Sequence, residues 1–259
     1  MHPLGLVETD DFIDEKLCRP LKIVYRDERF VAVFKPAGLI VHRSQTTLAH
    51  EPVLLQSLRD QLHCHLYPVH RLDRPTAGLI LFGLSAEAAA KMVDLFTNRK
   101  VLKYYQALVC GLTPDAGLVD EPLGEIRIDD LSSGGLVSGA TQDAVTRYET
   151  LARYHTSWLT GTEVASFSLL EIQPLTGRSH QIRRHLKLLG HGVVGDHRYG
   201  DAVSNQVMYD STSVYRMLLT SMRLDFRHPY SGELHSIVVG RGSEFDRAIA
   251  KMEPFGIAK

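Results

Sequence analysis

Apolar and polar residues alternate along several short runs of this chain, and such alternation is typical of strands. Residues 21–26 and 30–34 are two β-rich runs separated by the polar residues 27–29, which predicts a hairpin. The second run leads into residues 35–42, where a proline and a glycine turn the chain out of the sheet. Further runs with strand character cover residues 79–82, 103–109, 145–151, 165–172 and 218–226.

Other segments repeat their apolar residues at helical spacing. In residues 53–62 a leucine recurs at every fourth position, which predicts a helix with one buried side. Ser85 can cap the start of a second helix. The stripe that this helix would bury consists of Ala89, Met92, Val93 and Phe96. Residues from Ser243 onward predict a short closing helix, whereas residues 201–213 have no clear periodicity and are expected to be a polar connection.

A third helix is expected after residue 178, with signals at both ends. Ser179 can cap its start, and Gly190 stands where a left-handed residue would end it. The buried stripe of this helix would be Ile182, Leu186 and Leu189. Arg183 comes one position after a buried residue, at the edge of the apolar face. We therefore expect it to be half buried and to reach inward.

The order of these elements predicts the fold class. Strands and helices do not alternate regularly enough for a doubly wound parallel sheet, and no internal repeat is present. We expect an α+β fold with a mixed, mainly antiparallel sheet and flanking helices and loops. Residues 1–20, with five acids against two bases, would form an acidic N-terminal extension, and residues 21–259 would form one domain. The Gly- and Ser-rich residues 129–139 are expected to be a mobile surface loop.

Composition narrows the class of protein. No run of eighteen apolar residues and no secretory signal is present, so we expect a cytoplasmic protein that does not engage a membrane. Cys18, Cys64 and Cys110 are odd in number and widely spaced, which argues against a disulfide framework and a zinc knuckle. Nothing in the sequence indicates an obligate protein partner.

Charge is distributed unevenly. The formal net charge of -1 argues against a chain that coats nucleic acid by bulk charge. Residues 178–198, however, carry five bases against one acid. Such a stripe in a neutral protein indicates that a phosphate-bearing ligand meets one face. A solvated helix face is the simpler alternative.

The strongest candidate for chemistry is the loop around Asp73. Arg71 and Arg74 flank this carboxylate, Pro75 ends any helix, and an apolar strand follows directly. Loops fixed by a buried strand are common positions for catalytic side chains. Taken alone, Asp73 is more simply explained as a residue that caps a turn.

Three separated segments resemble the signature segments of the RluA-type pseudouridine synthases. They are residues 35–42, residues 70–78 and residues 176–183. A weaker fourth match consists of Lys103, Tyr105, Ala107 and Gly111. The resemblance extends over most of the chain. It implies the α+β catalytic domain of that family, isomerisation of uridine in RNA to pseudouridine, and no cofactor.

The resemblance also implies roles for individual residues. Asp73 would be the covalent catalyst, attacking either C1′ of the ribose or C6 of the base. Arg183 would be its counter-ion, because a carboxylate in a pocket that excludes water needs an opposite charge to remain ionised. Tyr105 would stack on the uracil or help to move its C5 proton, although a core strand tyrosine is equally compatible with the residues. Ile182 would pack under the pocket.

RNA binding follows from the same resemblance. A stacked uridine must be flipped out to reach a side chain, and Arg71 would insert where the base was. His42 and His70 are more simply structural than catalytic. Contacts to the RNA backbone are expected from Arg74, Arg178, Arg184, Lys187 and Arg198.

Several features bear on the substrate. Residues 41–44, the doubled arginine at 183–184 and residues 195–196 resemble the branch of the family that modifies uridine 65 of certain tRNAs. We expect no S4 RNA-binding domain ahead of residue 21, which also favours a small substrate such as tRNA. The alternatives are a 23S rRNA pseudouridine synthase and a non-catalytic RNA-binding protein or chaperone. A metallohydrolase is disfavoured, because the spacing of His180, His185, His191 and His197 does not place two ligands on one helix face.

Overall fold

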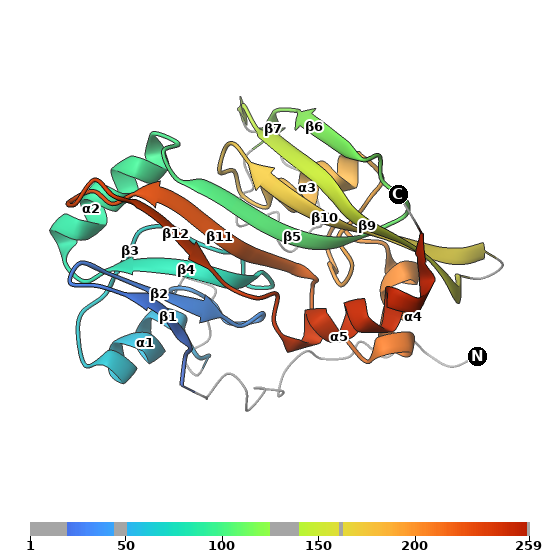
Figure 1. Cartoon of the computed structure of the whole chain (residues 1–259), viewed down its shortest axis with the longest axis horizontal. Coiled ribbons are helices and arrows are strands. Elements are labelled where there is room, and N and C mark those ends of the chain that lie inside the picture. The colour runs from blue at the N-terminus through green and yellow to red at the C-terminus, as the bar shows by residue number, and fades with distance from the viewer. Residues whose placement is uncertain (1–19, 44–50, 125–139, 161–162, 258–259) are drawn as a thin grey trace.

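A single curved sheet crosses the computed structural model, which describes residues 20–43, 51–124, 140–160 and 163–257 (Figure 1). Within these residues the sheet has 11 strands. Its hydrogen-bonded path runs in the order β1 (Ile23–Arg26), β2 (Phe30–Lys35), β4 (Ala77–Gly83), β11 (Leu219–Arg227), β5 (Leu102–Cys110), β10 (Glu163–Pro174), β9 (Val145–Thr160) and β13 (Gly256–Ile257). Three strands pair beside this path, namely β3 (Tyr67–Pro68), β12 (Leu234–Val238) and β6 (Ala116–Asp120). A separate two-stranded ribbon joins β7 (Leu123–Gly124) to β8 (Thr141–Gln142).

One parallel pairing joins the two halves of the sheet. Strand β4 runs parallel to β11, with Ala77 opposite Thr220, while the other named strand pairs are antiparallel. Gly78 makes this pairing possible, since a Cβ there would lie 2.2 Å from the carbonyl oxygen of Ser221 and its φ is +111°. The expectation of an α+β fold with a mixed, mainly antiparallel sheet is confirmed.

Helices cover both faces of the sheet. They are α1 (Leu54–Leu62), α2 (Ala86–Thr97), α3 (Gln181–Leu188), α4 (Ala202–Thr212) and α5 (Ser243–Met252), followed by the 3-10 turn η3 (Glu253–Phe255). In β4, Ile80 and Phe82 pack in a core cluster with α1 and α3, whereas Leu79 and Leu81 pack in a cluster with α2. Figure 1 shows α1 and α2 near the end of the sheet that holds β1 and β2, and α4 and α5 near β9.

Several local predictions are confirmed. The β1–β2 hairpin, helix α1, strands β4, β5 and β11 and the closing helix α5 all form where the patterns place them. The Ser85 hydroxyl accepts a hydrogen bond from the Ala88 amide at 3.1 Å and so caps α2 as expected. Strands β9 and β10 are both longer than their apolar alternation predicted.

The buried stripe of α2 differs from the prediction. Val93 is 41% exposed, while Ala88, Ala89 and Met92 are buried. Each helical residue turns the direction of the side chain by about 100°. The residues that pack on the sheet are therefore centred on Met92, and Val93 points away from it.

Three expectations for the helix after residue 178 are wrong. Helix α3 begins at Gln181 after His180, whose φ is +54°, and Ser179 does not cap it. Leu189 is 40% exposed, because the helix ends there and Gly190, with φ +80°, turns the chain away. Arg183 is 5% exposed and is therefore buried rather than half buried.

The expected polar connection after residue 200 contains helix α4. The Asp201 carboxylate caps this helix by accepting a hydrogen bond from the Ser204 amide at 2.7 Å. Of its apolar side chains, Met208 is buried in the core and Val207 is partly buried against it. With so few buried positions the helical period was weak, which explains why the pattern missed it.

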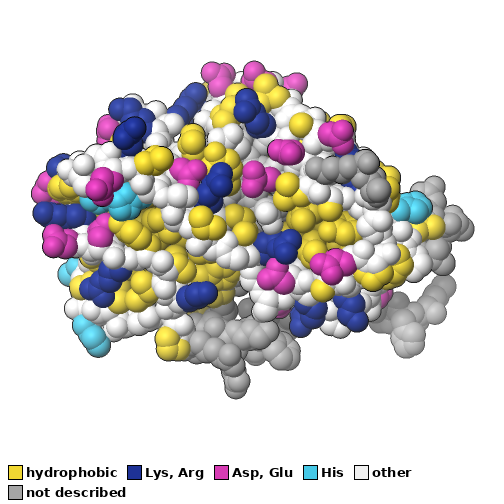
Figure 2. Space-filling view, in the orientation of Figure 1, with side chains coloured by type: hydrophobic (Ala, Val, Ile, Leu, Met, Phe, Trp, Pro, Cys, Tyr) yellow, Lys and Arg dark blue, Asp and Glu magenta, His cyan; other side chains and the backbone are white. Residues whose placement is uncertain are grey.

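Two predicted segments, residues 129–139 and almost all of the acidic extension 1–20, lie outside the described residues. Among the described cysteines, Cys64 and Cys110 are free thiols. Every helix of the described chain is too short or too polar to cross a lipid bilayer. On the face shown in Figure 2, basic and acidic side chains are interspersed, in keeping with the formal net charge of -1.

Candidate active site

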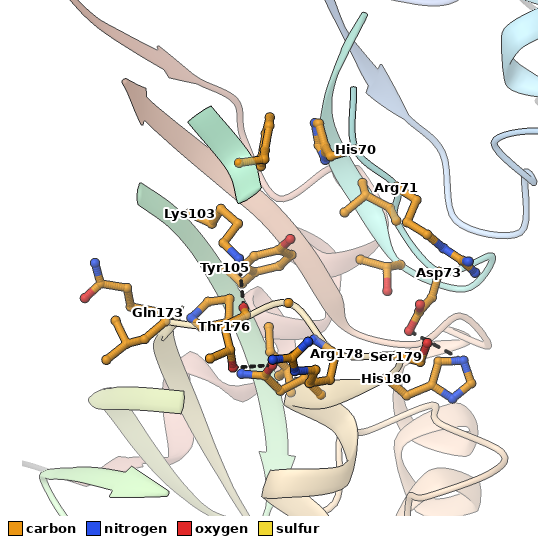
Figure 3. Close-up of a pocket in the computed structure, with 18 of the residues that line it drawn as sticks. His70, Arg71, Asp73, Lys103, Tyr105, Gln173, Thr176, Arg178, Ser179 and His180 are labelled. Carbon is orange, nitrogen blue, oxygen red and sulfur yellow. Dashed lines mark hydrogen bonds and ion pairs between the residues drawn. The ribbon is translucent and has the colours of Figure 1, made fainter. Parts of the chain in front are cut away.

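A cavity of about 520 Å³ opens beside the loop that precedes β4 (Figure 3). Its walls come from this loop, from the end of α2, from β5 and β11, and from the segment that leads from β10 into α3. Side chains that line it include Asp73, Tyr105, His180, Ile182 and Arg183. The fold therefore brings four residues that the resemblance singled out to one cavity, although up to 110 positions separate them in the sequence. They are Asp73, Tyr105, Ile182 and Arg183.

Backbone hydrogen bonds hold the Asp73 loop in place. The carbonyl of Asp73 accepts a hydrogen bond from the Thr76 amide at 3.0 Å, which closes a turn. The carbonyl of Arg74 accepts a hydrogen bond from the Gly38 amide at 2.9 Å. Residues 35–42 and the Asp73 loop thus form one unit, and the Asp73 side chain is 18% exposed at the cavity wall.

The buried side chain of Lys35 holds this unit together by hydrogen bonds to backbone carbonyls. Its side chain is 0% exposed, and Nζ donates hydrogen bonds to the carbonyls of Pro36, Leu39 and Arg74 at 2.9, 2.7 and 3.0 Å. Burial lowers the pKa of Lys35 to about 7, against the opposing effect of the Asp73 charge. Sequence reasoning did not single out this lysine. A lysine at the end of an apolar strand, directly before a proline, was the available signal.

Arg183 binds two carboxylates. Its Nη1 lies 3.2 Å from Oδ2 of Asp73, so the expected ion pair is present. Its Nε and Nη2 donate hydrogen bonds to Asp196 at 2.7 and 2.9 Å, which is a bidentate pairing. Burial acts to lower the pKa of Arg183, but hydrogen bonds and charge from Asp196, and then from Asp73, raise it above its ordinary value.

Asp196 is a second residue of the site to which sequence reasoning assigned no role. Its side chain is 0% exposed, and Oδ1 also accepts hydrogen bonds from the amides of Arg198 and Tyr199 at 2.9 and 3.1 Å. Burial acts to raise its pKa, yet the hydrogen bonds and charge of Arg183 hold that pKa below the ordinary value. The available signal was a lone acid inside a stretch of five bases.

His180 also lies close to the Asp73 carboxylate. Its Nε2 is 3.9 Å from Oδ2 of Asp73, and its Nδ1 is 3.0 Å from the Tyr199 hydroxyl. Burial lowers the pKa of His180 to about 4, so its ring is neutral at pH 7. The Tyr199 ring in turn lies beside Arg183, with the guanidinium carbon 5.0 Å from the ring centroid.

Tyr105 and Ile182 line the cavity near these charged groups. Tyr105 is 9% exposed and Ile182 is 7% exposed. Burial raises the pKa of Tyr105 to about 12, which keeps the phenol protonated at pH 7. The neighbouring Tyr104 does not line the cavity, and the Arg223 guanidinium lies 3.8 Å from its ring centroid. The two tyrosines are neighbours in β5, and successive side chains of a strand point to opposite faces of the sheet.

The cations expected to bind RNA fall into three groups. Arg71 and Arg178 line the cavity, and Nε of Arg178 donates to the carbonyl of Asp143 at 3.0 Å. Arg74 lies outside the lining, with 60% of its side chain exposed and an ion pair to Glu51 at 2.9 Å. The exposed Lys187 and the half-buried Arg198 do not line the cavity either.

Arg184 is more enclosed than the other expected RNA-binding cations. It is 8% exposed, and its Nη1 donates to the carbonyl of Gly124 at 2.9 Å. We therefore expect it to contribute more to stability than to RNA binding. The doubling of arginines at 183–184 therefore reflects two buried contacts on neighbouring sides of α3.

The histidines counted as possible metal ligands make separate contacts. His185 bonds with the Thr146 hydroxyl and the Glu121 carbonyl, and His191 bonds with the Cys110 carbonyl. Within the described ranges, no three His, Cys, Asp or Glu side chains gather as a metal site would require. The chemical groups that the cavity offers are therefore the carboxylate of Asp73, the guanidinium of Arg183, the imidazole of His180 and the phenol of Tyr105.

A mixed sheet that carries an aspartate loop against a buried arginine is what the resemblance to the RluA-type pseudouridine synthases led us to expect. Residues 29–188 match the family model described as RNA pseudouridylate synthase. The match covers more than half of the chain, so the chain belongs to this family. Its activity is isomerisation of uridine to pseudouridine.

Within this family, the chain is similar to relatives that share one name. The chain is 41% identical over 210 residues to tRNA pseudouridine synthase C of Haemophilus ducreyi, covering 81% of this chain and 86% of the relative. It is 41% identical over 213 residues to the protein of the same name from Vibrio cholerae, covering 82% and 87%. The relative of that name from Salmonella typhimurium is 37% identical over 232 residues, which is 89% of each chain.

Solved structures agree with this assignment. The chain is similar to human RNA Pseudouridylate Synthase Domain Containing 4, with a TM-score of 0.67 and 28% identity, covering 92% of this chain and 94% of that one. Human RNA Pseudouridylate Synthase Domain Containing 1 gives a TM-score of 0.65 and 27% identity, covering 85% and 83%.

Proposed function

We propose that this protein isomerises a uridine of tRNA to pseudouridine at position 65, the reaction classed as EC 5.4.99.26. The relatives named tRNA pseudouridine synthase C support tRNA as the substrate. The resemblance of residues 41–44 and 195–196 to that branch supports the position. Residues 21–259 act as the catalytic domain. The free thiols Cys64 and Cys110 fit a reducing, cytoplasmic setting.

The single observation that carries the proposal is the ion pair of Asp73 with the buried Arg183 at the cavity wall, at 3.2 Å. A carboxylate held in this way presents an oxygen to the cavity without being able to swing away. Nothing is added or lost when uridine becomes pseudouridine, so one covalent catalyst suffices. The residues therefore require no cofactor and no metal.

Attack at the sugar is one route. An oxygen of Asp73 bonds to C1′, and the N1 to C1′ bond breaks with its electron pair leaving on the uracil. The uracil turns, C5 bonds to C1′, and the Asp73 oxygen leaves as a carboxylate. The C5 proton is then lost and N1 gains a proton, so the atoms balance. Attack on C6 of the base is the alternative, and it uses the same carboxylate.

The cavity wall supplies the remaining functions. Tyr105 offers an aromatic face to the turning uracil and a protonated phenol near the C5 proton. Ile182 gives an apolar surface beside Arg183. Arg71 is exposed at the rim, where its planar cation can fill the space that the flipped base leaves in the RNA.

The test of the proposal begins with Asp73→Asn. This variant should lose pseudouridine formation on tRNA while still binding tRNA, because the amide keeps the shape of the carboxylate but not its nucleophilicity. Near wild-type isomerisation by this variant would show that Asp73 is not the nucleophile.

The substrate is tested in cells that lack the gene. Carbodiimide mapping of pseudouridine should lose a signal at tRNA position 65 and recover it when the gene is restored. Loss of a signal only in 23S rRNA would replace tRNA by rRNA as the substrate and keep the family. Loss of no signal in either RNA would favour the non-catalytic RNA-binding or chaperone role.

A further inference from the structure

The cavity extends well beyond the group around Asp73. Figure 3 shows Lys103 and Gln173 at the opposite end from Asp73 and His180, with Tyr105 between them. Phe96 and Arg99 line the cavity as well, from the end of α2. The volume of about 520 Å³ falls in the range of pockets that enclose whole ligands, so this distal end has room for more than the reacting base.

Lys103 is a partly satisfied cation in this distal end. Among the residues that the structure describes, its Nζ donates one hydrogen bond, to the carbonyl of Thr176 at 2.8 Å. An ammonium group has three donors, so two remain for a ligand. Burial and, after it, the charge of Arg99 lower the pKa of Lys103 to about 8. No acidic group contributes to that shift.

Arg99 provides the second cation. It follows α2 with φ +58°, and its amide bonds to the Phe96 carbonyl at 3.1 Å, which closes the end of the helix. Its side chain is exposed at the cavity and makes no hydrogen bond or ion pair with the described residues. A left-handed, non-glycine residue is uncommon, and here the conformation directs the chain so that Arg99 joins the cavity lining.

The charge balance of the lining favours an anion. Asp73 is the one carboxylate among the described residues that line the cavity, and it pairs with Arg183. Arg99 and Lys103 therefore have like-charged neighbours and no carboxylate in the lining to offset them. An anionic ligand would relieve this repulsion and take up the donors that remain.

We infer that Arg99 and Lys103 bind a backbone phosphate of the substrate RNA, so that the cavity holds part of the chain flanking the flipped uridine. This inference rests on the proposed function for the identity of the RNA. Phe96 adds an apolar wall beside the phosphate, with its ring stacked on His70 at a centroid distance of 4.6 Å. Loss of this contact should raise KM, because the substrate then binds more weakly. It should leave the rate of the chemical step unchanged.

The experiment compares Arg99→Gln and Lys103→Met with the wild-type protein on a tRNA transcript at several salt concentrations. Each variant should raise Kd and KM by about tenfold, change kcat by less than about twofold, and lower the slope of log K against log salt by about 1. Lys103→Arg should retain the slope because it retains the charge. Arg26→Gln and Lys251→Met are matched controls, since both remove an exposed cation outside the cavity lining.

The outcomes separate the two proposals. Unchanged KM and an unchanged salt slope in Arg99→Gln and Lys103→Met, with active wild-type protein, would overturn the phosphate site alone. An equal loss in the two controls would also overturn it, because the effect would then be one of total charge. A wild-type protein that binds tRNA but forms no pseudouridine in any RNA would refute the proposed function, while the salt slopes would still test the site. Thermal unfolding of Lys103→Met and Lys103→Arg separates loss of the Thr176 contact from loss of charge.

Discussion

At the scale of single residues, the sharing of Arg183 between two carboxylates explains how the site tolerates a change of charge. In the proposed reaction, a covalent bond to Asp73 would convert that carboxylate into a neutral ester. A buried arginine left without a partner would be strongly destabilising. Asp196 accepts two hydrogen bonds from the same guanidinium, so Arg183 would remain paired throughout the proposed reaction. We therefore expect Asp196 to act as a positioning residue.

Replacement of this arginine should affect the fold as well as the reaction. Arg183→Ala leaves two carboxylates, one of them fully buried, without their cation, and such a loss typically costs about 3–5 kcal/mol. We expect the free energy of unfolding in urea to fall by that amount and activity to disappear. Arg26→Ala, an exposed control on β1, should unfold like the wild type. Equal midpoints for Arg183→Ala and wild type would contradict the buried pairing.

The two carboxylates should differ in what they stabilise. Asp73→Asn imitates the neutral ester, and because Asp196 still holds Arg183 its unfolding midpoint should stay near that of the wild type. Asp196→Asn removes the bidentate partner and should lower the midpoint clearly. The double variant should be less stable than the sum of the single changes predicts, since Arg183 then has no anion. Additive effects would show that the carboxylates do not share the arginine.

Stability should fall as the pH is lowered through the range in which histidines ordinarily titrate. Burial lowers the pKa of His70 to about 3 and that of His180 to about 4. The unfolded chain therefore binds more protons than the folded chain between about pH 3 and the ordinary histidine pKa of about 6.5. The stability that the neutral His70 and His180 allow is fully present above about pH 6.5, and it is lost as the pH falls toward about 3.

His70→Asn tests this pH dependence. The His70 Nε2 accepts a hydrogen bond from the Leu81 amide at 3.0 Å, and an asparagine oxygen can also accept one. The slope of unfolding free energy against pH between 4 and 6 should be smaller in this variant. An unchanged slope would mean that His70 is charged in the folded protein.

At the scale of elements, the Asp73 loop owes its position to the strands on either side of it. Lys35 at the end of β2 binds the Arg74 carbonyl, and Gly78 at the start of β4 packs directly on β11. The loop is therefore anchored at two points, Arg74 and Gly78, that both follow Asp73 in the chain. Neither Lys35 nor Gly78 lines the cavity, so both affect the site by holding the Asp73 loop in position.

Gly78 and Gly38 provide a matched test of the second anchor. Both have positive φ, but a Cβ at Gly78 would lie 2.2 Å from the Ser221 carbonyl oxygen, whereas a Cβ at Gly38 would meet nothing within 4 Å. Gly38→Ala should lose about 1 kcal/mol through backbone strain. Gly78→Ala should lose clearly more, because β4 and β11 must separate, and its kcat should fall with its stability. Similar losses in both variants, measured by urea unfolding, would show that the close pairing is dispensable.

At the scale of the whole molecule, the fold gathers basic side chains around the cavity, although the composition has no excess of positive charge. The formal net charge is -1, and the face shown in Figure 2 mixes both signs. The cavity lining instead contains Arg71, Arg99, Lys103 and Arg178 in addition to the paired Arg183. RNA recognition should therefore depend on a few cations around one opening.

Arg178 and Arg184 should respond differently although six positions separate them. Arg178→Gln removes a cation from the cavity lining and should weaken tRNA binding, with a salt slope smaller by about 1. Arg184→Gln removes a buried contact to Gly124 and should lower stability by about 1–3 kcal/mol with little change in that slope. Filter binding over a range of salt and urea unfolding check the two effects. A reduced salt slope in Arg184→Gln would contradict the burial of its guanidinium.

Much of the fold could be predicted from local patterns. The hairpin, the cap at Ser85 and helix α5 depend on neighbouring residues, and their signals are short-range. The predictions failed at Val93 and Leu189, where exposure depends on how a helix is rotated and where it ends against the sheet. Helix α4 was missed because few of its side chains are buried, so no period marks it.

The site shows the same division. The residues around Asp73 and Arg183 were recognisable through a family resemblance, which places them together without showing the contact. No role in the site was predicted for Asp196, Lys35 or His180, although each lies in a segment that the resemblance used. Their contacts are hydrogen bonds and ion pairs to groups distant in the sequence. A lone acid or lysine has no meaning in a pattern until its neighbours in space are known.

The sequence by itself determined most of the strands and helices and the mainly antiparallel α+β class, because side-chain periodicity and turn chemistry are local. The choice of Asp73 as the nucleophile candidate came from the family resemblance. Only the tertiary structure decided that β4 pairs with β11 and that Arg183 serves two carboxylates. It also divided the basic stretch of residues 178–198 into buried and exposed cations. Ion pairing and desolvation depend on distance and enclosure, and both are properties of the folded chain.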